Sequence, residues 1–66
     1  DEDGYFALIR AAFGQRRKTA ANAIASGLGL PKAKVIAAIE AAGFDARIRP
    51  EALTLEDFAA VQRELN

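Results

Sequence analysis

The spacing of apolar residues predicts helices along most of the chain. In the first segment they recur at intervals of three and four residues, which is helical spacing and not the alternation of a strand. The residues concerned are Phe6, Ile9 and Phe13, flanked by Tyr5, Leu8 and Ala12. Asp3 is the predicted N-cap, and Gly14 is predicted to take the left-handed conformation that ends a helix. The pattern therefore predicts a first helix over residues 3–13.

A narrower apolar stripe predicts a second helix, for which Thr19 is the expected N-cap. The stripe consists of Ala20, Ala23, Ile24 and Leu28. Its small residues allow a neighbouring helix to approach closely. The run from Ser26 to Pro31 interrupts the period, and Pro31 suits the first turn of a third helix.

The third helix is predicted to turn apolar side chains inward and charged ones outward. The inward set is Val35, Ile36 and Ile39, and the outward set is Lys32, Lys34 and Glu40. Gly43 is placed to take the left-handed conformation just past the helix end. Phe44 then falls where it packs back on Ile39, as in a Schellman ending.

Residues 45–53 have no clean period, and Arg49 is expected to be extended because it precedes Pro50. The fourth helix opens with a clear local signal. Thr54 and Asp57 have the spacing of a capping box, and Leu53 is placed to staple onto Phe58. Its predicted inner face is Leu55, Phe58, Val61 and Leu65.

These segments predict an all-α fold. We expect residues 1–66 to form one small domain of about four short helices, packed as an orthogonal bundle. A chain of 66 residues is near the lower limit for folding without disulfides or metals, so a modestly stable domain is expected. No apolar run approaches the length of a membrane span, and no signal-peptide pattern opens the chain. A cytoplasmic monomer with no membrane partner is therefore expected.

The composition argues against catalysis by this chain alone. It contains no cysteine and no histidine, which removes the thiolate metal ligand and the commonest general base. Glu51, Glu56 and Asp57 are clustered carboxylates, and their place at a helix start explains them as charges that suit the helix dipole. We therefore predict no catalytic, cofactor-binding or metal-binding residue.

The net charge of zero hides a partition along the chain. Residues 1–9 carry three acids and no base, so their charge is −3. Residues 10–49 carry eight bases and two acids, which gives +6, and residues 50–66 carry four acids and one base, which gives −3. A middle section of this charge is enough to attract a polyanion.

The centre of that section is Gln15-Arg16-Arg17-Lys18-Thr19, which we call the basic corner (residues 15–19). Arginine engages phosphate through two parallel hydrogen bonds and lysine acts as a point charge, so the basic corner is a candidate RNA contact. The residues that we expect to contribute are Gln15, Arg16, Arg17, Lys18, Asn22, Arg10, Lys32, Lys34, Arg47 and Arg49. The alternative is a solvated turn whose arginine stems cover the edge of a small core.

A helix-turn-helix is a second candidate for nucleic-acid binding. Ala25, Gly29 and Val35 have the spacing of that motif's small residue, turn glycine and buried aliphatic residue. The third helix would then read DNA with an outward face of Lys32, Ala33, Lys34, Ala37, Ala38, Glu40 and Ala41. Lysines and alanines hold phosphate but read little sequence. We therefore favour two packed helices joined by a Gly-Pro turn.

Two stretches of the chain match a known family. The first is residues 6–19, which contain the run Phe-Gly-Gln-Arg-Arg-Lys-Thr and are followed by Asn22. The second is Ala42-Gly43-Phe44-Asp45, followed by residues 49–58, Arg-Pro-Glu-Ala-Leu-Thr-Leu-Glu-Asp-Phe. In this order they resemble the C-terminal domain of the bacterial small-subunit rRNA adenine dimethyltransferases of the KsgA type, over nearly all of the chain.

The resemblance implies a parent enzyme with a larger N-terminal domain that binds S-adenosylmethionine and dimethylates two adjacent adenosines of the small-subunit rRNA. The C-terminal domain would dock that enzyme on the pre-ribosomal particle. The family's Asn/Asp-Leu/Pro-Pro-Tyr/Phe catalytic motif does not occur in this chain, so no catalytic residue carries over. What carries over is the basic corner with Asn22, and a small-subunit rRNA partner.

One departure from the family stands beside the basic corner. Ala20 and Ala21 occupy positions where the family usually has a leucine and then a basic residue. An apolar anchor and one potential phosphate contact are therefore missing, which implies a looser second helix and weaker binding. A third possibility is a structural lid that only packs on the catalytic domain, which predicts bare apolar surface on this chain.

Overall fold

The computed structural model describes residues 2–15 and 17–65. Along the chain these residues form α1 (Glu2–Phe13), α2 (Ala20–Leu28), α3 (Lys32–Ala41), the short 3-10 helix η1 (Pro50–Ala52) and α4 (Leu55–Leu65). Within those two ranges there is no strand, so the all-α prediction with four α-helices is confirmed. None of the helices described is long and apolar enough to cross a membrane.

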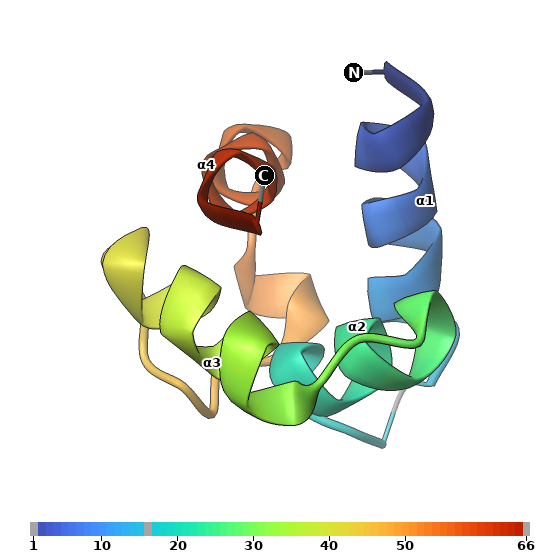
Figure 1. Cartoon of the computed structure of the whole chain (residues 1–66), viewed down its shortest axis with the longest axis horizontal. Coiled ribbons are helices and arrows are strands. Elements are labelled where there is room, and N and C mark those ends of the chain that lie inside the picture. Colours follow the sequence, from blue (N-terminus) through green and yellow to red (C-terminus); the bar gives the residue numbers. More distant parts are fainter. Residues whose placement is uncertain (1, 16, 66) are drawn as a thin grey trace.

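The helices run in clearly different directions around one interior (Figure 1). α1 packs on α2 and on α4, and α3 packs on α2 and on α4. In Figure 1 α4 is seen nearly end-on while α1 lies along the picture plane, as expected for an orthogonal bundle. η1 contacts α1 and leads the chain from the loop after α3 into α4.

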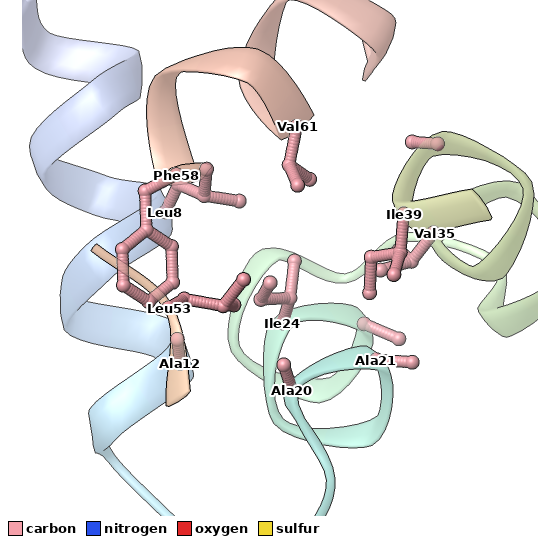
Figure 2. Packing of buried hydrophobic residues seen from close by; sticks show 12 residues of the cluster. Leu8, Ala12, Ala20, Ala21, Ile24, Val35, Ile39, Leu53, Phe58 and Val61 are labelled. Carbon is pink, nitrogen blue, oxygen red and sulfur yellow. The ribbon is translucent and has the colours of Figure 1, made fainter. Parts of the chain in front are cut away.

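The core draws on every α-helix and on Leu53, two residues before α4. Figure 2 shows these side chains pointing into one interior, with Leu8 and Phe58 on one side and Val35 and Ile39 on the other. The largest fully buried side chains are Phe58, Leu8, Ile24, Ile39, Val35, Val61 and Pro50. Burial of a side chain of this size stabilises the fold by roughly 1.5–3 kcal/mol, so this short list carries most of the stability.

Most helix ends follow the local signals, although Asp3, the predicted N-cap of the first helix, lies inside α1, which begins at Glu2. The Thr19 side chain accepts a hydrogen bond from the Asn22 N–H at 3.3 Å, so the predicted N-cap of α2 is confirmed. The capping box is also confirmed. The Asp57 carboxylate accepts from the Thr54 N–H at 2.9 Å, and the Thr54 hydroxyl accepts from the Asp57 N–H at 3.1 Å.

The Schellman ending of α3 is confirmed as well. Gly43 has a φ of 96°, its N–H donates to the Glu40 carbonyl, and the Phe44 N–H donates to the Ile39 carbonyl at 3.1 Å. Arg49 is extended as predicted, with φ −88° and ψ 150°. Pro31 stands one residue earlier than predicted, at the N-cap of α3.

The prediction that Gly14 ends α1 in the left-handed conformation is wrong. In the part of the chain that the structure describes, only Gly29 and Gly43 have positive φ. The Gly14 N–H donates to the Ala11 carbonyl at 3.3 Å, so α1 ends in a right-handed turn. Such a turn needs no glycine.

The apolar residues that predicted α1 are not buried alike. Leu8 and Ala12 are buried, whereas Phe6 and Phe13 are 54% and 47% exposed. α1 is apolar around much of its circumference, so its neighbours decide which side is buried. The turn of α1 that holds Ala11 packs closely on α2, and this contact directs Leu8 and Ala12 into the core.

The inner face predicted for α4 contains one error. Phe58 and Val61 are buried and Leu65 packs against the core, but Leu55 is 66% exposed. At about 100° per residue, Leu55 points roughly 90° away from the direction that the other three share. Leu53, which lies just before the capping box, is buried in the core instead, as the staple with Phe58 requires.

Candidate nucleic-acid interface

The described residues of the basic corner lie between the end of α1 and the start of α2. The Lys18 N–H donates to the Gln15 carbonyl at 3.1 Å. The Arg17 and Lys18 side chains are exposed, so both cations point into solvent. Arg16, the remaining predicted contact of this run, lies outside the described residues.

A second segment brings further cations to this turn. The Arg49 Nη1 donates to the Arg17 carbonyl oxygen at 3.5 Å, across 32 positions of the sequence. The Ala20 N–H donates to the Ile48 carbonyl at 2.9 Å, which fixes the loop before η1 against the start of α2. Arg49 therefore joins the basic corner.

Arg47 lies on that same loop, and its side chain is exposed. Asp45, the one carboxylate between residues 41 and 49, accepts from the Arg47 backbone N–H at 2.7 Å. That contact shapes the loop and leaves the guanidinium of Arg47 on the surface. The loop therefore adds positive charge beside the basic corner.

The first turn of α2 leaves little free backbone for an anion. The Ala20 N–H is bonded to Ile48, the Asn22 N–H to the Thr19 hydroxyl, and the Ala23 N–H to the Thr19 carbonyl. A phosphate at this corner must therefore be held mainly by side chains and not by helix N–H groups. Ala20 and Ala21, which stand where the family usually has a leucine and a basic residue, are both fully buried. Neither side chain therefore adds a phosphate contact.

Gln15 is held by a residue that sequence reasoning missed. Its Nε2 donates to the Ser26 hydroxyl at 3.4 Å, from the turn to the outer side of α2. Ser26 follows Asn22 by one helical turn, and this spacing could have indicated that Ser26 lies on the same side of α2 as Asn22. Gln15 and Arg10 also line a surface hollow of about 360 Å³ between α1 and α2, whose floor consists of alanines and Gly27.

Lys32 and Lys34 are not brought to the basic corner. They lie in the first turn of α3, beyond the opposite end of α2 from Thr19, and both are exposed. The nine residues of α2 span about 13 Å at 1.5 Å per residue. Lys34 instead lines a hollow with the N-terminal half of α1, including Gly4 and Ala7.

The helix-turn-helix spacing is present in three dimensions. α2 and α3 are joined by residues 29–31, Gly29 has a φ of 67°, and Ala25 and Val35 are buried. The outward face predicted for α3 needs one correction, because Ala38 is only 4% exposed and belongs to the core. The exposed residues of α3 are Lys32, Ala33, Lys34, Ala37, Glu40 and Ala41. This set offers few groups that hydrogen-bond base edges.

The acidic residues near α4 are explained by their positions at the starts of helices. Asp57 completes the capping box, and Glu51 and Glu56 are exposed in the first turns of η1 and α4. In the ranges described, no three acidic, histidine or cysteine side chains gather in a way that could hold a metal ion.

Comparison with known proteins identifies relatives over nearly the whole chain, although no family model matches it. The chain is 51% identical over 65 residues to ribosomal RNA small subunit methyltransferase A of Moorella thermoacetica, a match that covers 98% of the chain and 22% of that protein. It is 47% identical over 60 residues to the protein of the same name from Desulfitobacterium hafniense, which covers 91% of the chain and 22% of that protein.

A third relative, from Alkaliphilus metalliredigens, has the same name and is 46% identical over 65 residues, with 97% of the chain and 23% of the relative covered. The chain thus spans 22–23% of the length of these proteins. The predicted resemblance is confirmed: over nearly its whole length, the chain is similar to one segment of the ribosomal RNA small subunit methyltransferase A proteins.

Proposed function

We propose that this chain is the noncatalytic C-terminal part of an S-adenosylmethionine-dependent rRNA adenine dimethyltransferase and that it docks the enzyme on small-subunit rRNA. The family relationship supports the substrate class. In this proposal the methyl donor binds to the part of the parent protein outside this chain. The process served is assembly of the small ribosomal subunit in the cytoplasm.

The observation that carries the proposal is the contact between Arg49 and the Arg17 carbonyl. It joins two segments, far apart in the sequence, into one cationic surface that includes Lys18 and Arg47. Each of these four side chains is exposed and reaches solvent from a turn or loop fixed by backbone hydrogen bonds. A surface of this kind suits the regularly spaced phosphates of an RNA strand.

The mechanism is positional. Phosphate contacts fix the register and orientation of a nucleic acid without reading its sequence. Gln15 and Asn22 would add hydrogen bonds at the same edge, with Gln15 oriented by Ser26. Docking brings the RNA to face the catalytic part of the parent protein. That part then selects the adenosines to be methylated.

The helix-turn-helix alternative has less support. Its geometry is present, but the exposed face of α3 is formed by alanines, two lysines and one glutamate. A reader of DNA sequence needs arginine, asparagine or glutamine aimed at base edges. Lys32 and Lys34 are better explained as a separate phosphate contact.

A titration of the 66-residue chain tests the proposal. Its affinity for a hairpin from the 3′ region of small-subunit rRNA is compared with that for duplex DNA across a salt series. We expect preference for RNA and a log–log salt slope of a few units, since each phosphate contact contributes about 0.7–0.9. The triple variant Arg16→Ala, Arg17→Ala, Lys18→Ala should weaken binding and flatten the slope.

Arg63→Ala is the matched control, because Arg63 is an exposed cation in the last turn of α4. It removes one positive charge without touching the basic corner and should leave the slope nearly unchanged. Unaltered RNA affinity and slope in the triple variant would reject the proposal. Equal or tighter binding to duplex DNA would favour the helix-turn-helix instead.

A further inference from the structure

The large apolar side chains that the described part of the chain leaves exposed belong to α1 and to the start of α4, two helices that pack on each other. They are Phe6, Phe13 and Leu55, with 54%, 47% and 66% of their surface exposed. Phe6 and Phe13 are seven residues apart on α1, so they point in directions that differ by only about 20°. Tyr5 and Ile9, which are half-buried, border the same side of α1.

Contacts at both ends of α1 connect this side of the helix with the first turn of α4. The Tyr5 hydroxyl donates to the Leu55 carbonyl at 3.0 Å, and the Tyr5 ring lies 5.6 Å from that of Phe6. At the other end of α1, the Phe13 ring lies 5.7 Å from that of Phe58, one helical turn after Leu55. We call Tyr5, Phe6, Ile9, Phe13 and Leu55 the apolar seam.

The apolar seam is not explained by the fold itself. Its exposed members lie outside the buried cluster that holds the helices together. Single exposed apolar residues need no explanation, but two phenylalanines and a leucine gathered at one helix junction indicate a surface that packs against something. A chain this short has few large apolar residues to leave outside its core.

We propose that the apolar seam packs against the part of the parent methyltransferase that lies outside this chain. The matched relatives supply the occupant, because the chain covers only 22% of the Moorella thermoacetica protein. Contacts between domains of one polypeptide typically bury about 600–1,500 Å² and combine an apolar centre with a polar rim. Two helical turns, about 10 Å along the helix axis, separate Phe6 from Phe13.

The rim of the seam indicates the chemistry of the opposing surface. Glu51, exposed on η1, lines a hollow of about 330 Å³ together with Phe13 and Pro50. Glu56 follows Leu55 directly and is exposed. The opposing surface should therefore be apolar at its centre and carry lysine or arginine along the edge that faces these two carboxylates.

This inference rests on the proposed function and adds where the rest of the parent protein would lie relative to the RNA. Pro50, in the hollow with Phe13, directly follows Arg49 of the cationic surface. A polypeptide seated on the apolar seam would therefore lie beside RNA held at the basic corner. The lid interpretation and the docking interpretation then describe two adjoining faces of one domain.

Thiol labelling tests the inference without RNA, so its failure would leave the proposed function untouched. The chain has no cysteine, and single-thiol variants therefore report one position each. Leu55→Cys probes the seam, and Ala33→Cys, on the exposed side of α3, is the matched control. Each is prepared in the 66-residue chain and in a hybrid in which this chain replaces the matching segment of the Moorella thermoacetica protein. Maleimide labelling of the relevant peptide is followed by mass spectrometry.

We expect both thiols to label rapidly in the 66-residue chain. In the hybrid, labelling of Leu55→Cys should slow at least tenfold, whereas that of Ala33→Cys should stay the same. Equal labelling of Leu55→Cys in both proteins would overturn the inference. Slowing in the 66-residue chain as its concentration rises, together with a dimer in sedimentation, would overturn it in favour of a second copy as occupant.

Hydrogen exchange of the intact Moorella thermoacetica relative provides a measurement that needs no hybrid. Exchange is compared between that protein and its isolated segment that matches this chain. Protection in the intact protein should rise for the segments matching residues 5–13 and 55–58 and should be unchanged for the segment matching α3. Equal changes in all three segments would reject the apolar seam as the docking surface.

Discussion

Gly27 of α2 lies directly against Ala11 of α1. A methyl group added at residue 27 would stand 2.5 Å from the Ala11 Cβ and 3.1 Å from its Cα, far inside normal contact distance. The two helices therefore approach as closely as their backbones allow. The basic corner connects these same two helices.

Gly27→Ala should destabilise the protein even though alanine is the better helix former. Helix propensity alone favours the substitution by about 1 kcal/mol. The clash with Ala11 forces the helices apart, and overpacking of this kind costs about 1–3 kcal/mol. We expect a net fall in the free energy of unfolding of about 1 kcal/mol, measured by urea denaturation followed by circular dichroism.

The double variant Ala11→Gly, Gly27→Ala is the control for this contact. It moves the methyl group from one helix to the other and relieves the clash. Its loss of stability should be smaller than the sum of the two single losses. A rise in stability for Gly27→Ala alone would show that the close approach does not constrain the fold.

The capping box at the start of α4 should contribute measurably to stability. Thr54→Ala removes the acceptor for the Asp57 N–H, and Asp57→Ala removes the acceptor for the Thr54 N–H. Each loss should lower the free energy of unfolding by about 1 kcal/mol. Because the two hydrogen bonds fix the same turn, the double variant should lose less than the sum, as a double-mutant cycle in thermal denaturation would show. Strict additivity would argue against reciprocal capping.

Truncation of two leucines should separate the core from the apolar seam. Leu8→Ala removes a side chain that is 1% exposed and should cost about 2–5 kcal/mol, enough to unfold much of a small domain. Leu55→Ala removes one that is 66% exposed and should change stability by less than about 0.5 kcal/mol. Chemical denaturation of both variants checks this contrast. A large loss for Leu55→Ala would mean that Leu55 supports the fold and is not a docking residue.

RNA binding should show two separate groups of cations. Arg49 donates to the main-chain carbonyl of Arg17, which Arg17→Ala keeps, so each substitution removes one cation from the same turn. Arg17→Ala and Arg49→Ala should each reduce the salt slope by about 0.7–0.9, and their effects should be coupled because both cations face the same stretch of RNA. Lys32→Ala and Lys34→Ala lie beyond the other end of α2, and their effects should add independently to that of Arg49→Ala. The measurement is the salt dependence of RNA affinity for single and double variants. Independent effects of Arg17 and Arg49 would contradict a shared contact.

The ends of the helices could be predicted because they depend on neighbours in the sequence. The Thr19 cap, the Thr54–Asp57 capping box and the Gly43–Phe44 ending each need partners within five residues. Local hydrogen bonds of this kind form in much the same way whatever lies across the core. Gly14 is the exception, because a glycine after a helix permits a left-handed ending without requiring it.

The buried side of α1, unlike the helix ends, could not be predicted from the sequence pattern. α1 is apolar on more than one side, and its period fits a stripe through Phe6 and Phe13 as well as one through Leu8 and Ala12. The contact of Ala11 with Gly27 and the position of α4 select the second stripe. The first stripe is then left for the apolar seam, and the spacing along the sequence does not distinguish the two.

The sequence by itself determined the helical elements, their caps, the cations of the candidate site and the family resemblance, since these lie in composition and short-range spacing. Only the tertiary structure decided which cations meet. It joined Arg49 to Arg17, added Ser26 as the partner of Gln15, and left Lys32 and Lys34 at the far end of α2. The physical reason is that such contacts follow from how helices pack, and packing is set by shape complementarity between segments distant in the sequence.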